Sequence, residues 1–235
     1  MDAFARFVPQ RLLELDGRAD ATEARLGDQI QRDMTVLFVD QRSFTARAEQ
    51  LDPNDTFALL NGFFAAIVPA IHEHGGVVDK YLGDGLMAIF PDSPAHAVGA
   101  ALQILERSRS LGVGVGIGIH AGPVTLGLVG ADGRIESTVV ADSVTIAARV
   151  ERLTRRFDVD LLVTDSVHER LPDELRRDSR PLGALMVKGK QRPVVVHEVF
   201  RADPEATRAV KRASLDLLTA AVAAFHEGRV DDAET

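Results

Sequence analysis

The sequence contains no cysteine, so disulfides, a thiol nucleophile and cysteine-ligated zinc are all excluded. It also lacks a long hydrophobic run: the longest, residues 63–71, is far shorter than the roughly 20 residues that cross a bilayer. The amino-terminal residues carry scattered charges of both signs in place of a signal peptide. We therefore expect a soluble, cytoplasmic protein without a membrane span.

Positive charge is scarce as well. The chain has 27 Lys and Arg against 35 Asp and Glu, a net charge of −8, whereas proteins that bind nucleic acid usually show a basic face. No G-x-x-x-x-G-K-[ST] loop occurs, which argues against a P-loop ATPase. A length of 235 residues with 46% hydrophobic content is enough for a full core, in one large domain or one domain with appendages.

The first half of the chain alternates predicted strands and helices. A continuous apolar run that ends in Asp40 predicts a buried strand, and apolar residues at i, i+3, i+4 and i+7 predict a helix capped by Asn54 or Asp55. The predicted order is a strand at 34–40, a helix ending at Gly75 and Gly76, two strands within 77–90, a helix at 93–108 and a strand at 112–120. This split βαβ order is that of a ferredoxin-like α+β fold.

Further elements follow this core. The stretch "VVADSVTIAARVERL", residues 139–153, predicts a helix capped by Asp142, and this helix places Thr145 and Arg149 one turn apart on the same face. The other predicted elements are a strand near 124–129, a strand at 160–165, a short helix from Asp165 and a final hairpin at 182–200.

The strand at 112–120 has glycine at every second position. Its valines and isoleucines share one face, while the opposite face has no side chains, because it consists of Gly112, Gly114, Gly116 and Gly118. Glycine weakens a strand unless something must come close to the backbone. The pattern therefore predicts that a helix or a ligand approaches this face.

Two acids stand out by their position. Asp40 ends a strand and Asp84 lies at the tip of a hairpin, and the split βαβ order places these two strands side by side. A carboxylate pair next to open backbone can hold a hard cation such as Mg²⁺, with water and substrate phosphates completing its shell. From position alone, each acid could equally be an ordinary turn residue.

The sequence around these acids resembles the class III nucleotidyl cyclases, the family of adenylate and guanylate cyclase catalytic domains. The resemblance covers about residues 33–200 and follows the family's motif order. The matching segments are "VLFVDQRSFT", "GGVVDKYLGDGLMAIF", "GVGIGIHAGPVTLGLVG", "TVVADSVTIAARVE" and "VKGKQRPVVVHEVF". It implies a palm-type βαββαβ core with C-terminal extension strands and helices, and a homodimer.

The resemblance also implies a metal site. Asp40 and Asp84 would hold two Mg²⁺ or Mn²⁺ ions, and the backbone carbonyl of Gln41 would add a ligand. The turn from Arg42 to Thr45, which contains Phe44, would lie under the phosphates. The ions would activate the ribose 3′-hydroxyl as it attacks the α-phosphate, so no protein nucleophile is required.

Other positions match the family's substrate-binding residues. Lys80 and Thr138 match the pair that reads the purine, and their residue types favour adenine, whereas guanylate cyclases usually have glutamate and cysteine there. Arg149 matches the arginine that stabilises the pentavalent phosphate. Lys190, or alternatively Lys188, matches the lysine that binds the triphosphate. Without the motifs, these side chains could be solvated or paired with nearby acids.

Three positions depart from the family pattern. Ser43 stands where a glycine normally opens the phosphate turn, and Ala141 replaces a common glycine. Thr145 stands where the family usually has an asparagine that orients the ribose. Poor orientation of the ribose could lower kcat by orders of magnitude.

These observations leave three functions open. The first is an adenylate cyclase that converts ATP to cyclic AMP and pyrophosphate in a symmetric homodimer with two shared sites. The second is a degenerate cyclase domain that binds nucleotide and serves as a dimerising or regulatory module. The third is a cyclase for GTP or a pyrimidine triphosphate.

The ends of the chain differ from its centre. We predict a helical connector at 1–31, a catalytic domain at 32–202 and a helical tail at 203–235, which resembles the start of a tetratricopeptide repeat. We therefore expect regulatory regions beyond this chain.

All seven histidines are expected to be structural or exposed, since His72 and His74 do not share a helix face.

Overall fold

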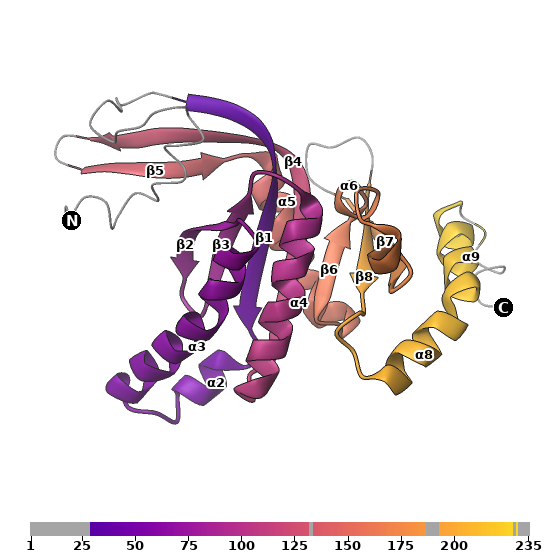
Figure 1. Ribbon diagram of the computed structural model, residues 1–235, viewed down its shortest axis with the longest axis horizontal. Helices are drawn as coiled ribbons and strands as arrows, with labels where there is room; N and C mark the ends of the chain where they lie inside the picture. Colours follow the sequence, from indigo (N-terminus) through magenta and orange to yellow (C-terminus); the bar gives the residue numbers. More distant parts are fainter. Residues whose placement is uncertain (1–28, 132–133, 187–192, 228, 230–235) are drawn as a thin grey trace.

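The computed structural model describes residues 29–131, 134–186, 193–227 and 229. One sheet of eight strands lies at the centre, with helices packed against it (Figure 1). The strands are β1 (Gln29–Gln41), β2 (Val77–Leu82), β3 (Gly85–Phe90), β4 (Val115–Ala131), β5 (Arg134–Val140), β6 (Leu161–Thr164), β7 (Ser179–Leu185) and β8 (Val194–Val199). The helices are α2 (Phe44–Ala48), α3 (Pro53–Glu73), α4 (Pro94–Ser110), α5 (Asp142–Phe157), α6 (Asp165–His168), α7 (Asp173–Arg176), α8 (Glu205–Ala213) and α9 (Leu215–His226).

The first four strands confirm the predicted ferredoxin-like core. They follow the chain order strand, helix, strand, strand, helix, strand, and lie in the sheet as β2-β3-β1-β4 with antiparallel neighbours. Strand β6 then adds parallel to β4, followed by β8 and β7. The fold is therefore α+β, with β1 at the centre of the core and the C-terminal strands as an extension.

The two faces of the sheet carry different helices because side chains alternate along each strand. Leu37 and Ile117 pack with Phe63 in the larger apolar cluster, to which α3 and α4 contribute. On the opposite face, Val36 packs in a cluster with Ala147 of α5. The end of β1 is thus held between two layers of buried side chains, which fixes the position of Asp40.

The glycines of β4 confirm that a helix approaches the strand. A Cβ on Gly118 would lie 2.1 Å from the amide nitrogen of Glu151, and one on Gly116 would lie 2.3 Å from Oγ1 of Thr154. Both contacts are with α5. The strand is shorter at this end than predicted, however, because it begins at Val115 after Gly112, which turns the chain at a φ of 67°.

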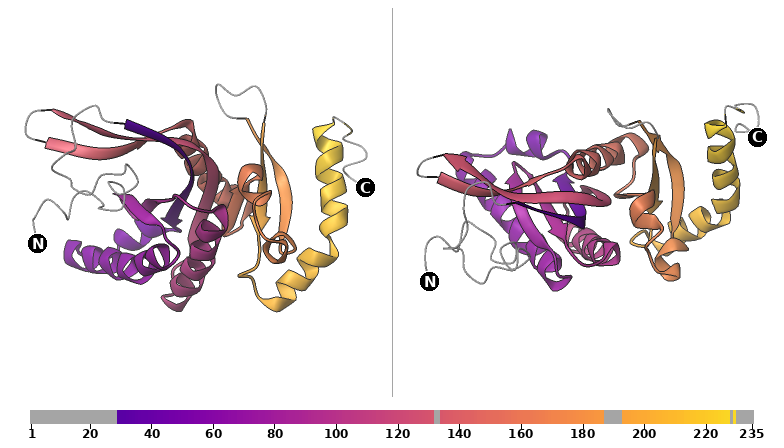
Figure 2. Two further views of the ribbon diagram at one scale, coloured as in Figure 1. Left: turned by 45° about the horizontal axis from the view of Figure 1, so that its top comes forward. Right: turned by 90° about the horizontal axis from the view of Figure 1, so that it is seen from above.

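At its other end β4 is longer than predicted. The separate strand expected near 124–129 is the continuation of β4, which runs through Pro123 in register with Asp33 of β1. Strand β5, which we did not predict, pairs with this second half. The two strands and the start of β1 project together beyond the helices as an arm (Figures 1 and 2).

Helix starts are partly as predicted. Helix α4 begins close to the predicted residue 93, and Ser93 caps it with its side chain. Helix α3 is capped by Asp52, which accepts a hydrogen bond from the Asp55 amide at 2.9 Å, and not by Asn54 or Asp55, because Pro53 already occupies the first helical position. In α5, Asp142 is the first helical residue and not the cap; a carboxylate there still favours the positive end of the helix dipole.

The final hairpin and the tail were predicted less completely. Strand β7 begins at Ser179, three residues before the predicted 182, and the short helices α2 and α7 were not predicted. The tail forms α8 and α9. Two buried carboxylates attach α8 to the sheet, since Asp178 accepts from Arg212 and Glu198 accepts from Lys211.

Within the described ranges, α3 is the one helix that is long and apolar enough to cross a membrane. Three features mark it as a core helix instead. Phe63, Ile67 and Ile71 are buried against the sheet, Pro69 interrupts its hydrogen bonding, and Glu73 pairs with Arg107 of α4 at 3.0 Å.

Candidate active site

The two predicted metal acids lie together. Strand β1 pairs with β3 so that Val39 is opposite Leu86, which brings the turn at Asp84 and Gly85 beside the end of β1. A Cβ on Gly85 would lie 2.8 Å from Oδ1 of Asp40. The glycine therefore lets the hairpin tip close onto the first acid.

The electrostatics of Asp40 fit a cation site. Burial raises the pKa of Asp40 above its ordinary value and the charge of Asp84 raises it further, while Arg155 and Arg152 lower it. Two carboxylates that disfavour each other's charge gain stability from a cation between them. Together with the carbonyl of Gln41 they form an all-oxygen donor set, which hard cations such as Mg²⁺ prefer.

The turn after β1 has a fixed backbone. Ser43 adopts φ 56° and ψ 26°, a left-handed conformation that favours glycine, at the position where the family pattern has glycine. Phe44 and Thr45 begin the short helix α2 next to it. The backbone of Arg42 ties this turn to the segment before β4, because its amide donates to the Gly114 carbonyl at 2.8 Å.

The side chain of Arg42 binds main-chain carbonyls of its own chain. Its Nε donates to the Val115 carbonyl at 3.3 Å and its Nη2 to the Val159 carbonyl at 2.5 Å, and it also lies 3.6 Å from Asp160. Main-chain carbonyls at two positions thus anchor it. We conclude that Arg42 stabilises the turn in place.

The structure describes some of the residues that are expected to bind the base and the triphosphate. Lys80 lies on β2, and its Nζ is 3.1 Å from Oδ2 of the adjacent Asp79, which is buried. The backbone of Thr138 lies on β5 opposite Gly127. Lys188 and Lys190 lie outside the described residues.

The exposed face of α5 carries the other two candidates. Thr145 is exposed and Arg149 is half-buried, one helical turn apart. Arg149 could pair with a nearby acid on its own helix, such as Glu151 or Asp142, but no ion pair joins it to Glu151 among the residues that the structure describes. Its guanidinium is free to bind an anionic group.

Sequence reasoning missed three residues of α5 that lie at the metal acids. Arg155 donates to Oδ2 of Asp40, and Arg152 and Glu151 line a cavity of about 180 Å³ together with Asp40 and Leu82. Burial raises the pKa of Glu151 to about 7, with a further contribution from Asp40. Their spacing from Ala148, at i+3, i+4 and i+7, is the signal that could have identified them.

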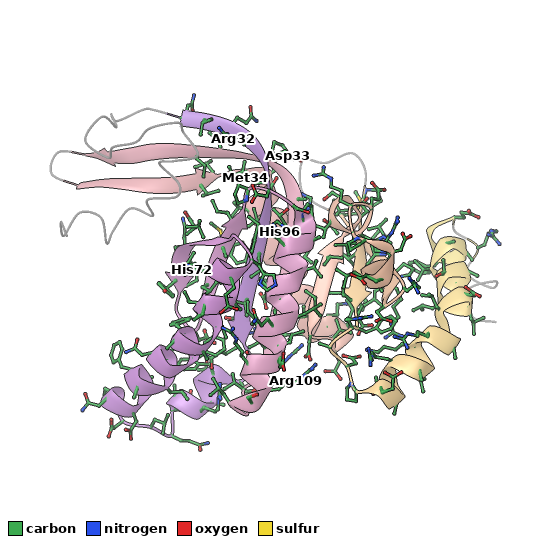
Figure 3. All side chains as sticks on the ribbon, in the orientation of Figure 1. Arg32, Asp33, Met34, His72, His96 and Arg109 are labelled. Atoms are coloured by element: carbon green, nitrogen blue, oxygen red, sulfur yellow. The ribbon has the colours of Figure 1, made fainter. Side chains whose placement is uncertain are left out.

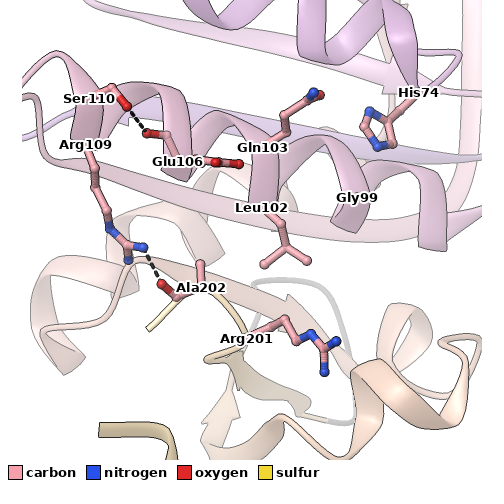
Figure 4. Close-up of a pocket in the computed structure, with 9 residues that line it drawn as sticks. All are labelled: His74, Gly99, Leu102, Gln103, Glu106, Arg109, Ser110, Arg201 and Ala202. Atoms are coloured by element: carbon pink, nitrogen blue, oxygen red, sulfur yellow. Dashed lines mark hydrogen bonds between the residues drawn. The ribbon is translucent and has the colours of Figure 1, made fainter. Parts of the chain in front are cut away.

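A larger cavity lies elsewhere. It has a volume of about 790 Å³ and lies between α4 and the chain after β8 (Figure 4). Its cations already have partners, since Arg109 donates to the Ala202 carbonyl and lies 3.0 Å from Asp160, and Arg201 bonds Asp178 at 2.9 Å. None of the predicted site residues lines it, so its size does not mark it as the active site.

The histidines do not form a metal site in the described part of the chain, where no group of three or more His, Asp or Glu residues could hold an ion. His72 and His96 are exposed on different helices (Figure 3). His168 and His197 stack with ring centroids 4.0 Å apart. These side chains agree with the structural or exposed roles expected for them.

The fold and the acid pair define a class of protein, the nucleotidyl cyclases. The sequence profile described as "Adenylate and Guanylate cyclase catalytic domain" matches residues 27–199, and the chain belongs to this family. An adenylate cyclase of Anabaena cylindrica is 36% identical over 215 residues, which are 85% of this chain and 43% of that protein. The chain therefore spans less than half of that relative's length.

Solved structures of the family share the fold. The adenylyl cyclase CyaB of P. aeruginosa matches 73% of this chain and 95% of its own, with a TM-score of 0.61 and 26% identity. A guanylyl cyclase matches 74% of this chain and 94% of its own, with a TM-score of 0.63 and 27% identity. The likeness is thus equal for the two kinds of cyclase and does not distinguish their substrates.

Proposed function

We propose that this chain is the catalytic domain of an adenylate cyclase that converts ATP to 3′,5′-cyclic AMP and pyrophosphate. The observation that carries the proposal is the closure of the Asp84 hairpin onto Asp40 at the end of β1. The residue types at Lys80 and Thr138 and the likeness to an adenylate cyclase of Anabaena cylindrica support adenine as the base.

Asp40, Asp84 and the carbonyl of Gln41 would hold Mg²⁺ or Mn²⁺, with two ions per site. Bound ions would lower the pKa of the 3′-hydroxyl and neutralise charge on the α-phosphate. The buried strand pair holds the two carboxylates at one place before substrate arrives, so their orientation costs little on binding. Phe44 and Thr45 at the start of α2 would lie under the phosphates.

The remaining roles fall to residues outside this acid pair. Arg149 would stabilise the charge of the pentavalent phosphate, Thr145 would contact the ribose, and Lys190 would bind the triphosphate. Lys80 and Thr138 would read the adenine edge. Following the family resemblance, we propose that a second copy of the chain supplies these residues to the acids, in a symmetric homodimer with two shared sites.

We propose residues 32–202 as the catalytic domain, with a helical connector at 1–31 and a helical tail at 203–235. The ion pairs of Lys211 and Arg212 with the buried acids of the sheet attach the start of this tail to the domain. The absence of cysteine and the packing of α3 in the core support a cytoplasmic location.

A degenerate, nucleotide-binding module is the second candidate. Two observations favour it: Ser43 has a left-handed backbone that glycine would adopt at lower cost, and Thr145 lacks the amide of asparagine. A cyclase for GTP or a pyrimidine triphosphate is a third candidate, since Thr145 could belong to a reshaped pocket.

One experiment separates these functions. The purified chain is incubated with each of the four nucleoside triphosphates and Mn²⁺ or Mg²⁺, and the cyclic products are resolved by chromatography. We expect cyclic AMP as the main product. More cyclic GMP than cyclic AMP would overturn the roles of Lys80 and Thr138, and no product from a confirmed dimer would favour the regulatory module.

A further inference from the structure

Arg155 on α5 contacts both of the groups that we assign to the metal ions on β1. Its Nη2 donates to Oδ2 of Asp40 and lies 3.5 Å from the carbonyl oxygen of Gln41. The other carboxylate oxygen, Oδ1, faces Gly85 of the hairpin. One cationic side chain of the protein therefore contacts both Oδ2 of Asp40 and the carbonyl oxygen of Gln41.

We propose that Arg155 competes with the divalent cation for Oδ2 of Asp40 and the Gln41 carbonyl, so that it regulates access of the ion to the site. This inference rests on the metal site of the proposed function. A Mg²⁺ ion binds oxygen at about 2.0–2.1 Å, and a guanidinium hydrogen bonded to the same oxygen occupies that space. Binding of the ion there requires Arg155 to leave.

Arg155 is able to leave because little else holds it. Its side chain is 54% exposed, and within the described residues its hydrogen bonds go to Asp40 and Gln41 alone. Arg42, which lies on the other side of Gln41, is 25% exposed and is fixed by the carbonyls of Val115 and Val159. Of these two arginines, Arg155 is the movable one.

The movement has to be a rotation of the side chain. The backbone of α5 cannot withdraw as a whole without opening its contact with β4, where the helix lies directly against Gly116 and Gly118. The helix is thus a fixed base from which Arg155 reaches the acid. Its long side chain can swing into solvent while the helix stays in place.

The surrounding charges make the competition matter. Arg152, three residues earlier on α5, lines the same cavity as Asp40, and Arg155 donates a hydrogen bond to it. Two cationic side chains of the same chain therefore lie near Asp40 before an ion binds. The binding free energy of an incoming ion is therefore the difference between its own interaction with Asp40 and the interaction of Arg155 that it replaces.

The test measures Mn²⁺ binding to the full chain by calorimetry without nucleotide. We expect Arg155→Gln to bind Mn²⁺ about fivefold more tightly than the unchanged protein, the upper range for loss of one partly exposed ion pair. Arg155→Lys, which keeps a charge but not the planar fork, should give an intermediate affinity. Arg156→Gln, one residue on and in the cavity beside α9, is the matched control and should leave affinity unchanged.

The outcomes decide between the claims. Equal Mn²⁺ affinity in Arg155→Gln and the unchanged protein overturns the role of Arg155 and leaves the metal site standing, provided Asp84→Asn removes binding. Weaker affinity in Arg155→Gln also overturns it, because Arg155 would then support the acid. No Mn²⁺ binding by any variant overturns the metal site and the competition together. Thermal unfolding of each variant without metal checks that it is folded.

Discussion

Gly118 of β4 and Glu151 of α5 are in direct backbone contact: a Cβ on the glycine would lie 2.1 Å from the amide nitrogen of the glutamate. A real Cβ atom cannot lie that close to another heavy atom. The amide nitrogen of Glu151 belongs to the main chain, so it cannot rotate away as a side chain could. The position of α5, and with it the position of every candidate on this helix, therefore depends on the lack of a side chain at residue 118.

We expect Gly118→Ala to destabilise the fold by on the order of 3 kcal/mol, the upper range for overpacking a core. Urea unfolding measures the change. Gly114→Ala is the matched control on the same segment, because its Cβ would meet Arg42 at 3.4 Å, an ordinary contact. Equal stability of the two variants would mean that α5 can move away from the sheet.

Asp84→Ala should abolish cyclase turnover and leave the oligomeric state unchanged, because the acid lies at a turn and contributes charge to the metal site. Turnover and light scattering of the same sample measure both. Asp92→Ala, an exposed acid just after β3, is the control and should keep activity. Persistent turnover in Asp84→Ala would show that the metal site is misplaced.

Thr145→Asn should raise kcat by about tenfold or more if the threonine orients the ribose poorly, since positioning can supply several kcal/mol of a barrier. The exposed side chain makes a folding defect from this change small. Steady-state kinetics with ATP measure kcat. Thr145→Val keeps the shape of the side chain and removes its hydroxyl, so it shows which of the two affects kcat. A fall in kcat for Thr145→Asn would show a pocket built around threonine.

Glu151 gives a pH-dependent stability. Burial raises the pKa of its carboxyl from 4.5 to about 7, so the folded protein keeps a proton that the unfolded chain has lost between these values. The stabilisation is complete below pH 4.5 and is lost as the pH rises through 7. Glu151→Gln stays neutral and should gain on the order of 3 kcal/mol relative to the unchanged protein between pH 4.5 and 8.

Urea unfolding in EDTA at pH 5 and pH 8 tests this prediction for Glu151. Glu106→Gln, an exposed position on α4, provides the control. A stability difference that stays constant across this range would contradict a buried, proton-retaining carboxyl.

His197 makes the stability of the fold depend on pH in the acid range. Burial, together with the smaller effect of the neighbouring His168, lowers its pKa from 6.5 to about 4, so between these values the unfolded chain binds a proton that the folded protein does not. Stability is therefore lost as the pH falls from 6.5 to 4. His197→Phe keeps a ring to stack on His168 and should lose less stability than the unchanged protein in this window, by on the order of 2 kcal/mol. Parallel acid-induced losses would contradict the prediction.

The sequence predicted the core well because its signals are local. The apolar run before Asp40, the alternating glycines and the glycine turn at Asp84 each follow from side-chain periodicity, and the structure has all three. Strand β5 was missed because it depends on pairing with β4, a contact that no local pattern reports. The same holds for Pro123, whose strand continues because its partner strand fixes the register.

The site was predicted through motifs, and these report only part of it. The motifs indicated Asp40 and Asp84 as candidate metal ligands. They did not indicate Arg155, because its contact with Asp40 depends on how α5 packs against β1. The roles of Thr138 and Lys190 stay predictions. The sequence also contains candidates for both halves of the shared site that we propose.

Helix α5 carries Arg149 and Arg155 six residues apart, about 9 Å along a rigid helix. In the proposed dimer, Arg149 serves the active site completed by the partner, while Arg155 contacts the metal acid of its own chain. Ion binding at one site and phosphate binding at the other thus act on the same helix. The two sites of such a dimer would be expected to show cooperativity, with occupancy of one changing the affinity of the other.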